Sequence, residues 1–268
     1  KRREKVINLL LLGRTVDDDS WDIIGNVMLI DVSTPLFADA RFDIDKMMED
    51  AFGKVFWVSL NEYQSVIFCN DPVDSIKSRA EMFCHTVEQK TGSVVTAILG
   101  GRISSPKELL SAYSNMEAKL DSKFYFKGSQ VLSAGRKSGS CEDEYLDRLQ
   151  DVKIYIQRGE KLRALTEIDY LFQEMEQSGA LSPLYVKFIC MNLLHNCVET
   201  NSNISRDTVY GYVEQLFHCN NIYELWDNMR RILSDTLEEN TLDERNVIRE
   251  VLEIVEKEFD KDISLEQI

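Results

Sequence analysis

The sequence has 268 residues, enough for one large domain or two domains of ordinary size. Hydrophobic residues make up 44% and charged residues 29%, which supports a folded core and excludes a wholly disordered chain. The 46 Asp and Glu residues outnumber the 31 Lys and Arg residues, giving a formal net charge of −15. Because DNA and anionic membranes attract clustered basic side chains, this chain alone is expected to bind neither nucleic acid nor membrane.

No apolar run approaches the roughly 18 residues of a membrane helix. The run Leu9–Leu12 is also shorter than the core of a signal peptide. The chain begins Lys1-Arg2-Arg3 without Met, so we expect its natural N-terminus to lie upstream. The six cysteines contain no Cys-x-x-Cys pair. We therefore predict reduced thiols, packed as small core residues, in a cytoplasmic protein.

In the first half of the chain, short apolar runs alternate with segments of helical periodicity. The predicted elements are strand 27–31, helix 43–52, strand 54–60, strand 65–69, helix 71–91, strand 93–99, helix 105–122 and strand 130–132. The two middle strands form a hairpin around the loop Asn61-Glu62-Tyr63-Gln64. Gly53 ends the first helix and Gly100-Gly101 stops the fourth strand.

Two helix starts carry particularly clear signals. Asp71-Pro72 places an N-cap before a proline at the first helical position, and Ser105-Pro106-Lys107-Glu108 is a capping box. Residues 133–142 are small and polar, as is typical of a linker. After the linker only helices are predicted, over 143–158, 160–178, 183–200, 205–219, 221–239 and 243–259.

This order predicts an α+β fold, with a ferredoxin-like mixed sheet carrying helices followed by an all-α domain. We assign an α/β domain to residues 1–132, a linker to 133–142, a helical domain to 143–240 and a connecting helix to 241–268. The connecting helix carries a stripe at helical spacing, formed by Val247, Ile248, Val251, Leu252, Ile254, Val255 and Phe259. This stripe is expected to pack either against the preceding helices or against a second copy of the chain.

The residues that carry catalytic chemistry are sparse. The three histidines are His85, His195 and His218, and the spacing of Cys190, His195 and Cys197 does not suit zinc ligands on one helix face. We therefore interpret helix 183–200 as contributing core residues rather than a metal site. We assign no catalytic, cofactor-binding or metal-binding residue.

Other common site motifs lead to the same conclusion. The acidic run Asp17-Asp18-Asp19 is interpreted as a solvated loop, and the sequence contains no Gly-x-Ser-x-Gly nucleophile motif. Gly100-Gly101 is followed by Arg-Ile-Ser-Ser, which does not match a phosphate-binding glycine loop.

The order of a strand ending in Asp31, a helix and a hairpin resembles the diguanylate cyclase (GGDEF) domain. In that family the hairpin carries Gly-Gly-Asp/Glu-Glu-Phe, and the strand-end Asp binds metal. The corresponding hairpin here reads Leu60-Asn61-Glu62-Tyr63-Gln64, with no glycine pair and a single acid. Glycines allow close approach to the nucleotide, and paired carboxylates hold Mg²⁺. The resemblance therefore implies a degenerate domain without cyclase activity, in which Asp31 is a relic or a structural turn residue.

Three further segments resemble AraC-type response regulators of two-component systems. Residues 92–132 include the aromatic segment Phe124-Tyr125-Phe126-Lys127-Gly128, which is similar to an aromatic sequence that closes the central region in that family. The helical segment 143–239 is similar to the region that follows. The last residues, Asp262-Ile263-Ser264-Leu265-Glu266-Gln267-Ile268, resemble the entry to the double helix-turn-helix module.

The resemblance implies a non-catalytic segment that transmits a signal from an upstream receiver to a downstream DNA-binding module. Its partners would be a cognate histidine kinase and promoter DNA, both reached through flanking domains, and a second copy of the chain is a further candidate partner. Helix 243–259 would couple the segment to the DNA-binding module. No cofactor is expected. The alternatives are a small-molecule effector domain, with its ligand between the two domains, and a cyclic-dinucleotide enzyme or binder.

Overall fold

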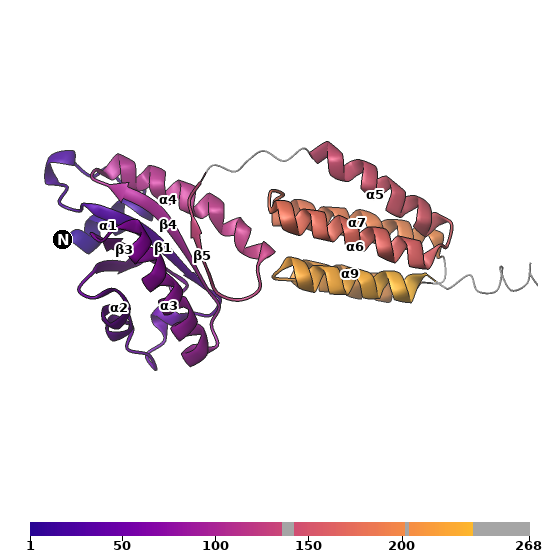
Figure 1. Cartoon of the computed structure of the whole chain (residues 1–268), viewed down its shortest axis with the longest axis horizontal. Coiled ribbons are helices and arrows are strands. Elements are labelled where there is room, and N and C mark those ends of the chain that lie inside the picture. Colours follow the sequence, from indigo (N-terminus) through magenta and orange to yellow (C-terminus); the bar gives the residue numbers. More distant parts are fainter. Residues whose placement is uncertain (136–141, 202–203, 238–268) are drawn as a thin grey trace, which may run out of the picture. The chain divides into compact units, whose positions relative to one another are not determined.

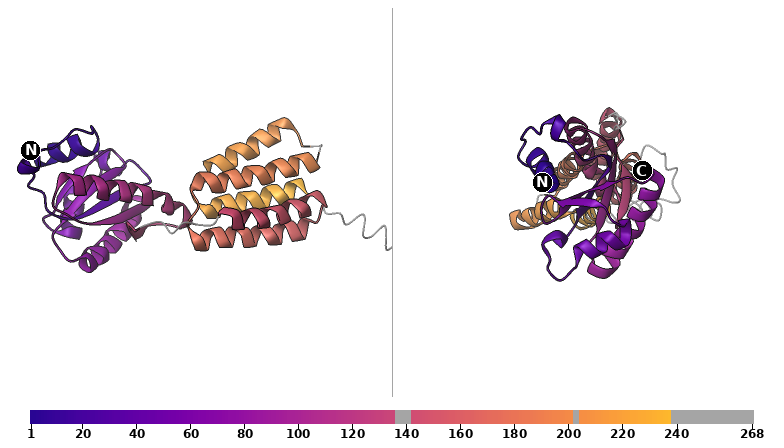
Figure 2. Two further views of the ribbon diagram at one scale, coloured as in Figure 1. Left: turned by 90° about the horizontal axis from the view of Figure 1, so that it is seen from above. Right: turned by 90° about the vertical axis from the view of Figure 1, so that its left-hand side faces the viewer.

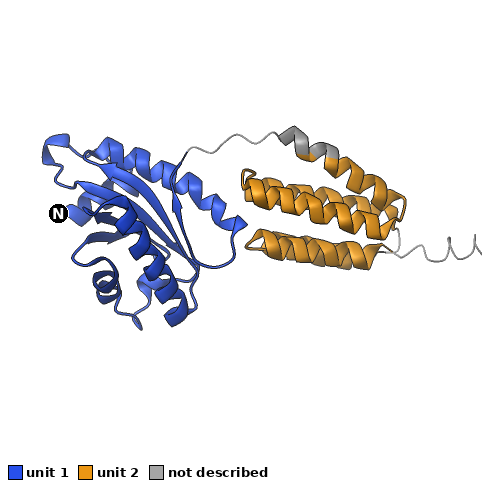
Figure 3. Cartoon of the chain, viewed as in Figure 1, with its two compact units in different colours: residues 1–139 blue, residues 140–268 orange. Residues whose placement is uncertain are grey.

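The computed structural model describes residues 1–135, 142–201 and 204–237. The chain divides into two compact units, residues 1–139 and residues 140–268, which are described separately here (Figure 3). The first unit contains a mixed five-stranded sheet with helices, and the described part of the second contains helices. The predicted α+β class is thereby confirmed.

The sheet of the first unit has the strand order β2-β3-β1-β4-β5. The strands are β1 (Gly25–Val32), β2 (Phe56–Ser59), β3 (Gln64–Cys69), β4 (Val95–Ile103) and β5 (Gln130–Ser133). Strand β1 is central and antiparallel to both β3 and β4, β2 is antiparallel to β3, and β5 is parallel to β4. Because β1 is covered on both faces, its sequence is an almost continuous apolar run rather than an alternating one.

Helices cover both faces of this sheet (Figure 1). Met28 and Ile30 of β1 point to the face covered by α2 (Ile44–Phe52) and α3 (Val73–Thr91). Val27 and Leu29 point to the face covered by α1 (Arg2–Leu10) and α4 (Pro106–Leu120). The period-two alternation of β1 therefore places Asp31, two residues after Leu29, on the α1 and α4 face.

Two features of the first unit differ from the prediction. Helix α1 was not predicted, because only Val6 and Leu9 of its nine residues are buried, which leaves too short an apolar stripe to recognise. Gly100-Gly101 does not stop β4, which continues to Ile103. A β-carbon at Gly100 would lie 2.6 Å from the sulfur of Met116, so this glycine allows α4 to pack closely on the sheet.

Of the two predicted helix caps, Ser105 is confirmed and Asp71 is wrong. Ser105 caps α4 as expected, because its hydroxyl accepts a hydrogen bond from the backbone N–H of Glu108 at 3.2 Å. Asp71 does not cap α3, which begins at Val73. The Asp71 carboxylate instead pairs with Arg79 at 2.9 Å, because a second-turn guanidinium offers it a charged partner.

The second unit contains α5 (Glu142–Gln157), α6 (Lys161–Ser178), α7 (Pro183–Thr200), α8 (Arg206–His218) and α9 (Ile222–Thr236). The five helices lie alongside one another (Figure 2), and α5 contacts both α6 and α7. Helix α7 contacts α5, α8 and α9, and α9 also contacts α6 and α8. These five helices match the predicted ranges within three residues, whereas predicted helix 243–259 lies outside the described residues.

The core of the helical unit is formed by apolar side chains. Phe172 of α6 is fully buried and stacks on Trp226 of α9, with ring centroids 5.9 Å apart. Helix α7 contributes the buried residues Val186, Ile189, Cys190, Leu193, Leu194 and Cys197. Yet Leu184 and Phe188 of the same helix are exposed, so α7 is apolar on two sides.

Candidate functional site

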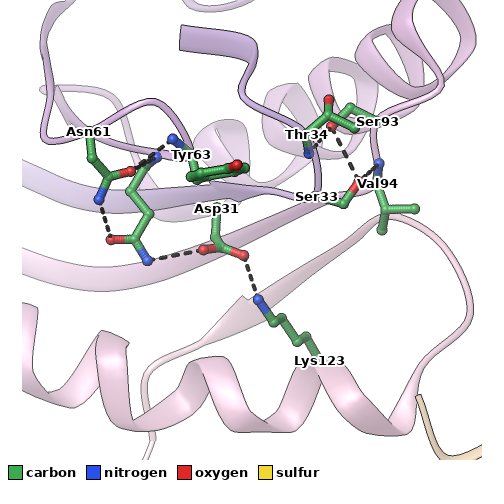
Figure 4. Close-up of polar contacts among 9 residues, drawn as sticks. Asp31, Ser33, Thr34, Asn61, Tyr63, Ser93, Val94 and Lys123 are labelled. Carbon is green, nitrogen blue, oxygen red and sulfur yellow. Dashed lines mark hydrogen bonds and ion pairs between the residues drawn. The ribbon is translucent and has the colours of Figure 1, made fainter. Parts of the chain in front are cut away.

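The polar centre of the first unit is Asp31, near the end of the central strand β1. Asp31 is only 7% exposed, and its partners across the sheet are Gln64 of β3 and Thr96 of β4. One carboxylate oxygen accepts a hydrogen bond from the side-chain amide of Gln64 at 3.0 Å. The other accepts from the ammonium group of Lys123 at 2.8 Å (Figure 4). Both oxygens of the buried carboxylate are therefore engaged.

The hairpin loop is held beside Asp31 by its own hydrogen bonds. The side-chain oxygen of Asn61 accepts from the backbone N–H groups of Tyr63 and Gln64, each at 2.8 Å. These two hydrogen bonds form an Asx turn, which holds the loop without a glycine. The backbone N–H of Val32 donates to the carbonyl of Tyr63 at 3.0 Å, which fixes the loop against the end of β1. The loop places Gln64, an amide, beside Asp31.

Lys123 reaches Asp31 from a short 3₁₀ helix, Asp121–Tyr125, that directly follows α4. The next two residues, Phe124 and Tyr125, are buried and meet edge to face with centroids 5.5 Å apart. These two rings fix the 3₁₀ turn, and with it the position of Lys123. The aromatic segment 124–128 noted in the sequence therefore includes the anchor of the cation in this centre, although Phe126 is itself exposed.

A second polar group lies just beyond the end of β1. The hydroxyl of Ser33 accepts from the backbone N–H of Val94 at 2.9 Å, and the fully buried Ser93 accepts from the N–H of Thr34 at 3.3 Å (Figure 4). These contacts join the segment after β1 to the segment before β4. They satisfy backbone groups at the strand ends.

This arrangement suits a structural ion pair better than metal-dependent chemistry. Divalent cations take several oxygen ligands, usually with more than one carboxylate. Asp31 has an amide and an ammonium group as its side-chain partners. Within residues 1–135, 142–201 and 204–237, no group of three or more His, Cys, Asp or Glu side chains could hold a metal ion.

The histidines and the described cysteines do not converge on one site. Cys190 and Cys197 of α7 are buried in the core of the helical unit, as predicted. The expectation that His195 of the same helix also packs in this core is wrong. The His195 side chain is 68% exposed and lies 3.2 Å from Glu199. Its position continues the exposed stripe of Leu184 and Phe188 at helical spacing. His85 and His218 are also exposed.

The described cysteines behave as core residues. Cys69, Cys84, Cys190, Cys197 and Cys219 are all buried free thiols, as predicted, while Cys141 lies outside the described residues. Burial raises the pKa of Cys69 and of Cys197 to about 11, and that of Cys84 to about 12. Because the thiolate is the nucleophile, these thiols are unreactive at neutral pH.

The remaining motif candidates are also accounted for. Asp17, Asp18 and Asp19 are exposed, as expected of a solvated segment, and the last two enter a short 3₁₀ helix. Gly100-Gly101 lies within β4 and forms no phosphate-binding loop.

A polar pocket of about 460 Å³ lies at the opposite end of β3 from Asp31. Its cationic side chains include Arg79, paired with Asp71 at 2.9 Å, and Arg2, paired with Asp22 at 2.7 Å. Hydrogen bonds from Arg2, and also from Lys5, lower the pKa of Asp22 to about 2. An anionic ligand would have to displace these carboxylates, so the pocket is not a ready anion site.

Comparison with protein-family models, with curated proteins and with solved structures found no match for the chain. Among the described residues, no helix has the length and apolar character needed to cross a membrane.

Proposed function

We propose that this chain is a non-catalytic, signal-transmitting region of an AraC-type transcriptional regulator, built from a degenerate GGDEF-like domain and a helical domain. The observation that carries the proposal is the Asp31 centre. In a GGDEF domain, the junction between the first strand and the hairpin would hold metal with acidic side chains. Here the Asp31 carboxylate contacts Gln64 and Lys123, so its charge is already compensated. A centre of this kind stabilises the sheet without performing nucleotide chemistry.

The strand order supports the GGDEF-like part of the proposal. A ferredoxin-like sheet is built from two βαβ units. One strand of each unit lies between the two strands of the other unit. The order β2-β3-β1-β4, with every neighbouring pair antiparallel, has this property. Strand β5 extends the sheet beyond β4.

The sequence resemblance supports the regulatory part. The aromatic segment that closes the first unit and the final seven residues, Asp262–Ile268, are similar to corresponding segments of AraC-type response regulators. A helical unit lies between these two segments. The proposed route of the signal is from a receiver, through the α/β unit and the helical unit, to a helix-turn-helix module.

DNA binding tests this proposal directly. Residues 1–268 alone are expected to give no shift of promoter DNA at physiological salt, because a net charge of −15 opposes binding to phosphates. The same protein extended beyond Ile268 by its natural sequence should bind, with an affinity that falls as salt rises. A salt-sensitive shift by residues 1–268, or an extended protein that never binds DNA, would contradict the proposal.

Nucleotide turnover tests the non-catalytic character. Incubation of the chain with GTP and Mg²⁺ or Mn²⁺ is expected to yield no cyclic dinucleotide. The Asn61 turn lacks the glycines needed for close nucleotide approach, and the hairpin residues 60–64 contain a single acid, Glu62, instead of paired carboxylates. Chromatography of the reaction mixture, beside an active cyclase under the same conditions, measures the product. Formation of product by this chain would overturn the assignment.

A further inference from the structure

The helical unit carries an apolar groove of about 430 Å³ between α7 and the end of α8. Leu184 and Phe188 of α7 are 72% and 59% exposed there, and Phe217 of α8 is 51% exposed. Tyr185 and Met191 complete its apolar lining. Side chains of this size, exposed together, indicate a surface that another element covers.

The opposite side of α7 already packs in the core of the unit. A helix that is apolar on all sides belongs in an interior position. Among the described helices, none covers the side that carries Leu184 and Phe188. We therefore expect an additional apolar segment to pack into the groove.

We infer that the stripe of residues 243–259 packs into this groove and completes the helical unit. This segment follows the described part of the chain after only five residues, 238–242. Its stripe of seven apolar residues, at helical spacing, predicts a helix face that packs against another apolar surface. The inference does not depend on the proposed regulatory function, because it concerns how this chain covers its own apolar surface.

The geometry of α7 and α9 brings the segment within reach. The side chain of Asn201, directly after α7, donates to the carbonyl of Thr236 at the end of α9, at 2.9 Å. The two helices therefore end side by side. Five further residues span at most about 17 Å, which is enough for the chain to turn back along α7.

A returning helix also has the right length and register. From Asn201 back to Phe188 is about 20 Å of helix, and the 17 residues 243–259 span about 25 Å. An antiparallel helix that starts beside Asn201 would bring Val255 close to Phe188 and Phe259 close to Leu184. Both are members of the apolar stripe.

Charge and tethering favour this occupant. Lys187 is the charged residue that lines the groove, and the segment 243–259 has six acidic residues against three basic ones. A segment tethered by five residues has an effective concentration in the millimolar range, which gives it an advantage over a second, untethered copy.

Engineered disulfides test the inference in the whole chain, with Cys141→Ser to remove the one cysteine outside the described residues. Phe188→Cys with Val255→Cys should form an intramolecular disulfide about tenfold faster than matched control pairs, because the two positions are held together. One control pairs Phe188→Cys with Glu253→Cys, on the opposite side of the predicted helix. The other pairs Tyr170→Cys, exposed on α6, with Val255→Cys. Equal rates in all three pairs, or disulfides formed between two chains, would overturn the inference.

Hydrogen exchange of the unmodified chain provides a second measurement. Amides within 247–259 are expected to exchange slowly, and Leu184→Glu should accelerate them at least about tenfold by disfavouring the packed state. Tyr170→Glu introduces the same charge at an exposed tyrosine of α6 and should leave this exchange unchanged. Fast exchange of the segment in the unmodified chain would overturn the inference even if a variant failed to fold.

Discussion

Lys123→Glu is expected to lower the free energy of unfolding of the first unit by about 2–4 kcal/mol. The substitution leaves the buried carboxylate of Asp31 without its cation and places a second carboxylate beside it. Breaking a fully buried ion pair costs about 3–5 kcal/mol, and the half-exposed position of Lys123 reduces that cost through solvent screening. Urea unfolding followed by circular dichroism and tryptophan fluorescence measures the change.

Two further variants make this expectation specific to the ion pair. Lys107→Glu carries the same change of charge at an exposed position near the start of α4, and should alter the stability by no more than about 0.5 kcal/mol. Adding Asp31→Asn to the Lys123→Glu chain should restore at least half of the lost stability, because the repulsion is removed while an oxygen remains for Gln64. A Lys123→Glu chain as stable as the Lys107→Glu chain would show that Asp31 does not need its cation.

Local sequence signals were sufficient for most elements of the fold. The apolar run of β1, the hairpin and the Ser105 capping box each act within a few residues, so their sequences specify them directly. The predicted end of β4 at Gly100 is wrong, because the role of this glycine depends on Met116, which lies on the helix packed against the sheet. The spatial order of the strands likewise depends on pairings between distant segments.

The sequence indicated the Asp31 side of this centre but not its cation. The sequence placed Asp31 beside the hairpin, and the lack of paired acids there was visible in the residues 60–64. Lys123 is 92 residues away and arrives on a 3₁₀ turn that no periodicity marks. Lys123 was not singled out from the sequence; the available signal is the aromatic pair Phe124-Tyr125, whose burial fixes the preceding residue.

In the helical unit, the sequence predicted the helices but not which of their faces would remain exposed. Helix α7 is apolar around most of its circumference, so its periodicity does not distinguish its core side from its groove side. Only the packing of α5 and α9 against α7 identifies Leu184 and Phe188 as uncovered.

Under the proposed function, a Gly-Gly insertion after Glu253 is expected to abolish signal-dependent transcription by the full-length protein. The proposed lever is the predicted helix 243–259, and two glycines in its interior cost helix stability and also turn the following residues by about 200°. Residues Val255 and Phe259 would then leave the apolar stripe. Transcription from the target promoter, measured with and without the signal, should fall to its uninduced level.

A four-alanine insertion at the same place is the matched control. Four residues turn the helix by about 400°, so the following residues return close to their original face, and alanine preserves the helix. This variant should retain most of the response, while both variants leave the DNA affinity of the isolated helix-turn-helix module unchanged. If the Gly-Gly chain still responds fully, residues 243–259 act as a tether, and the signal reaches the DNA-binding module without a continuous helix.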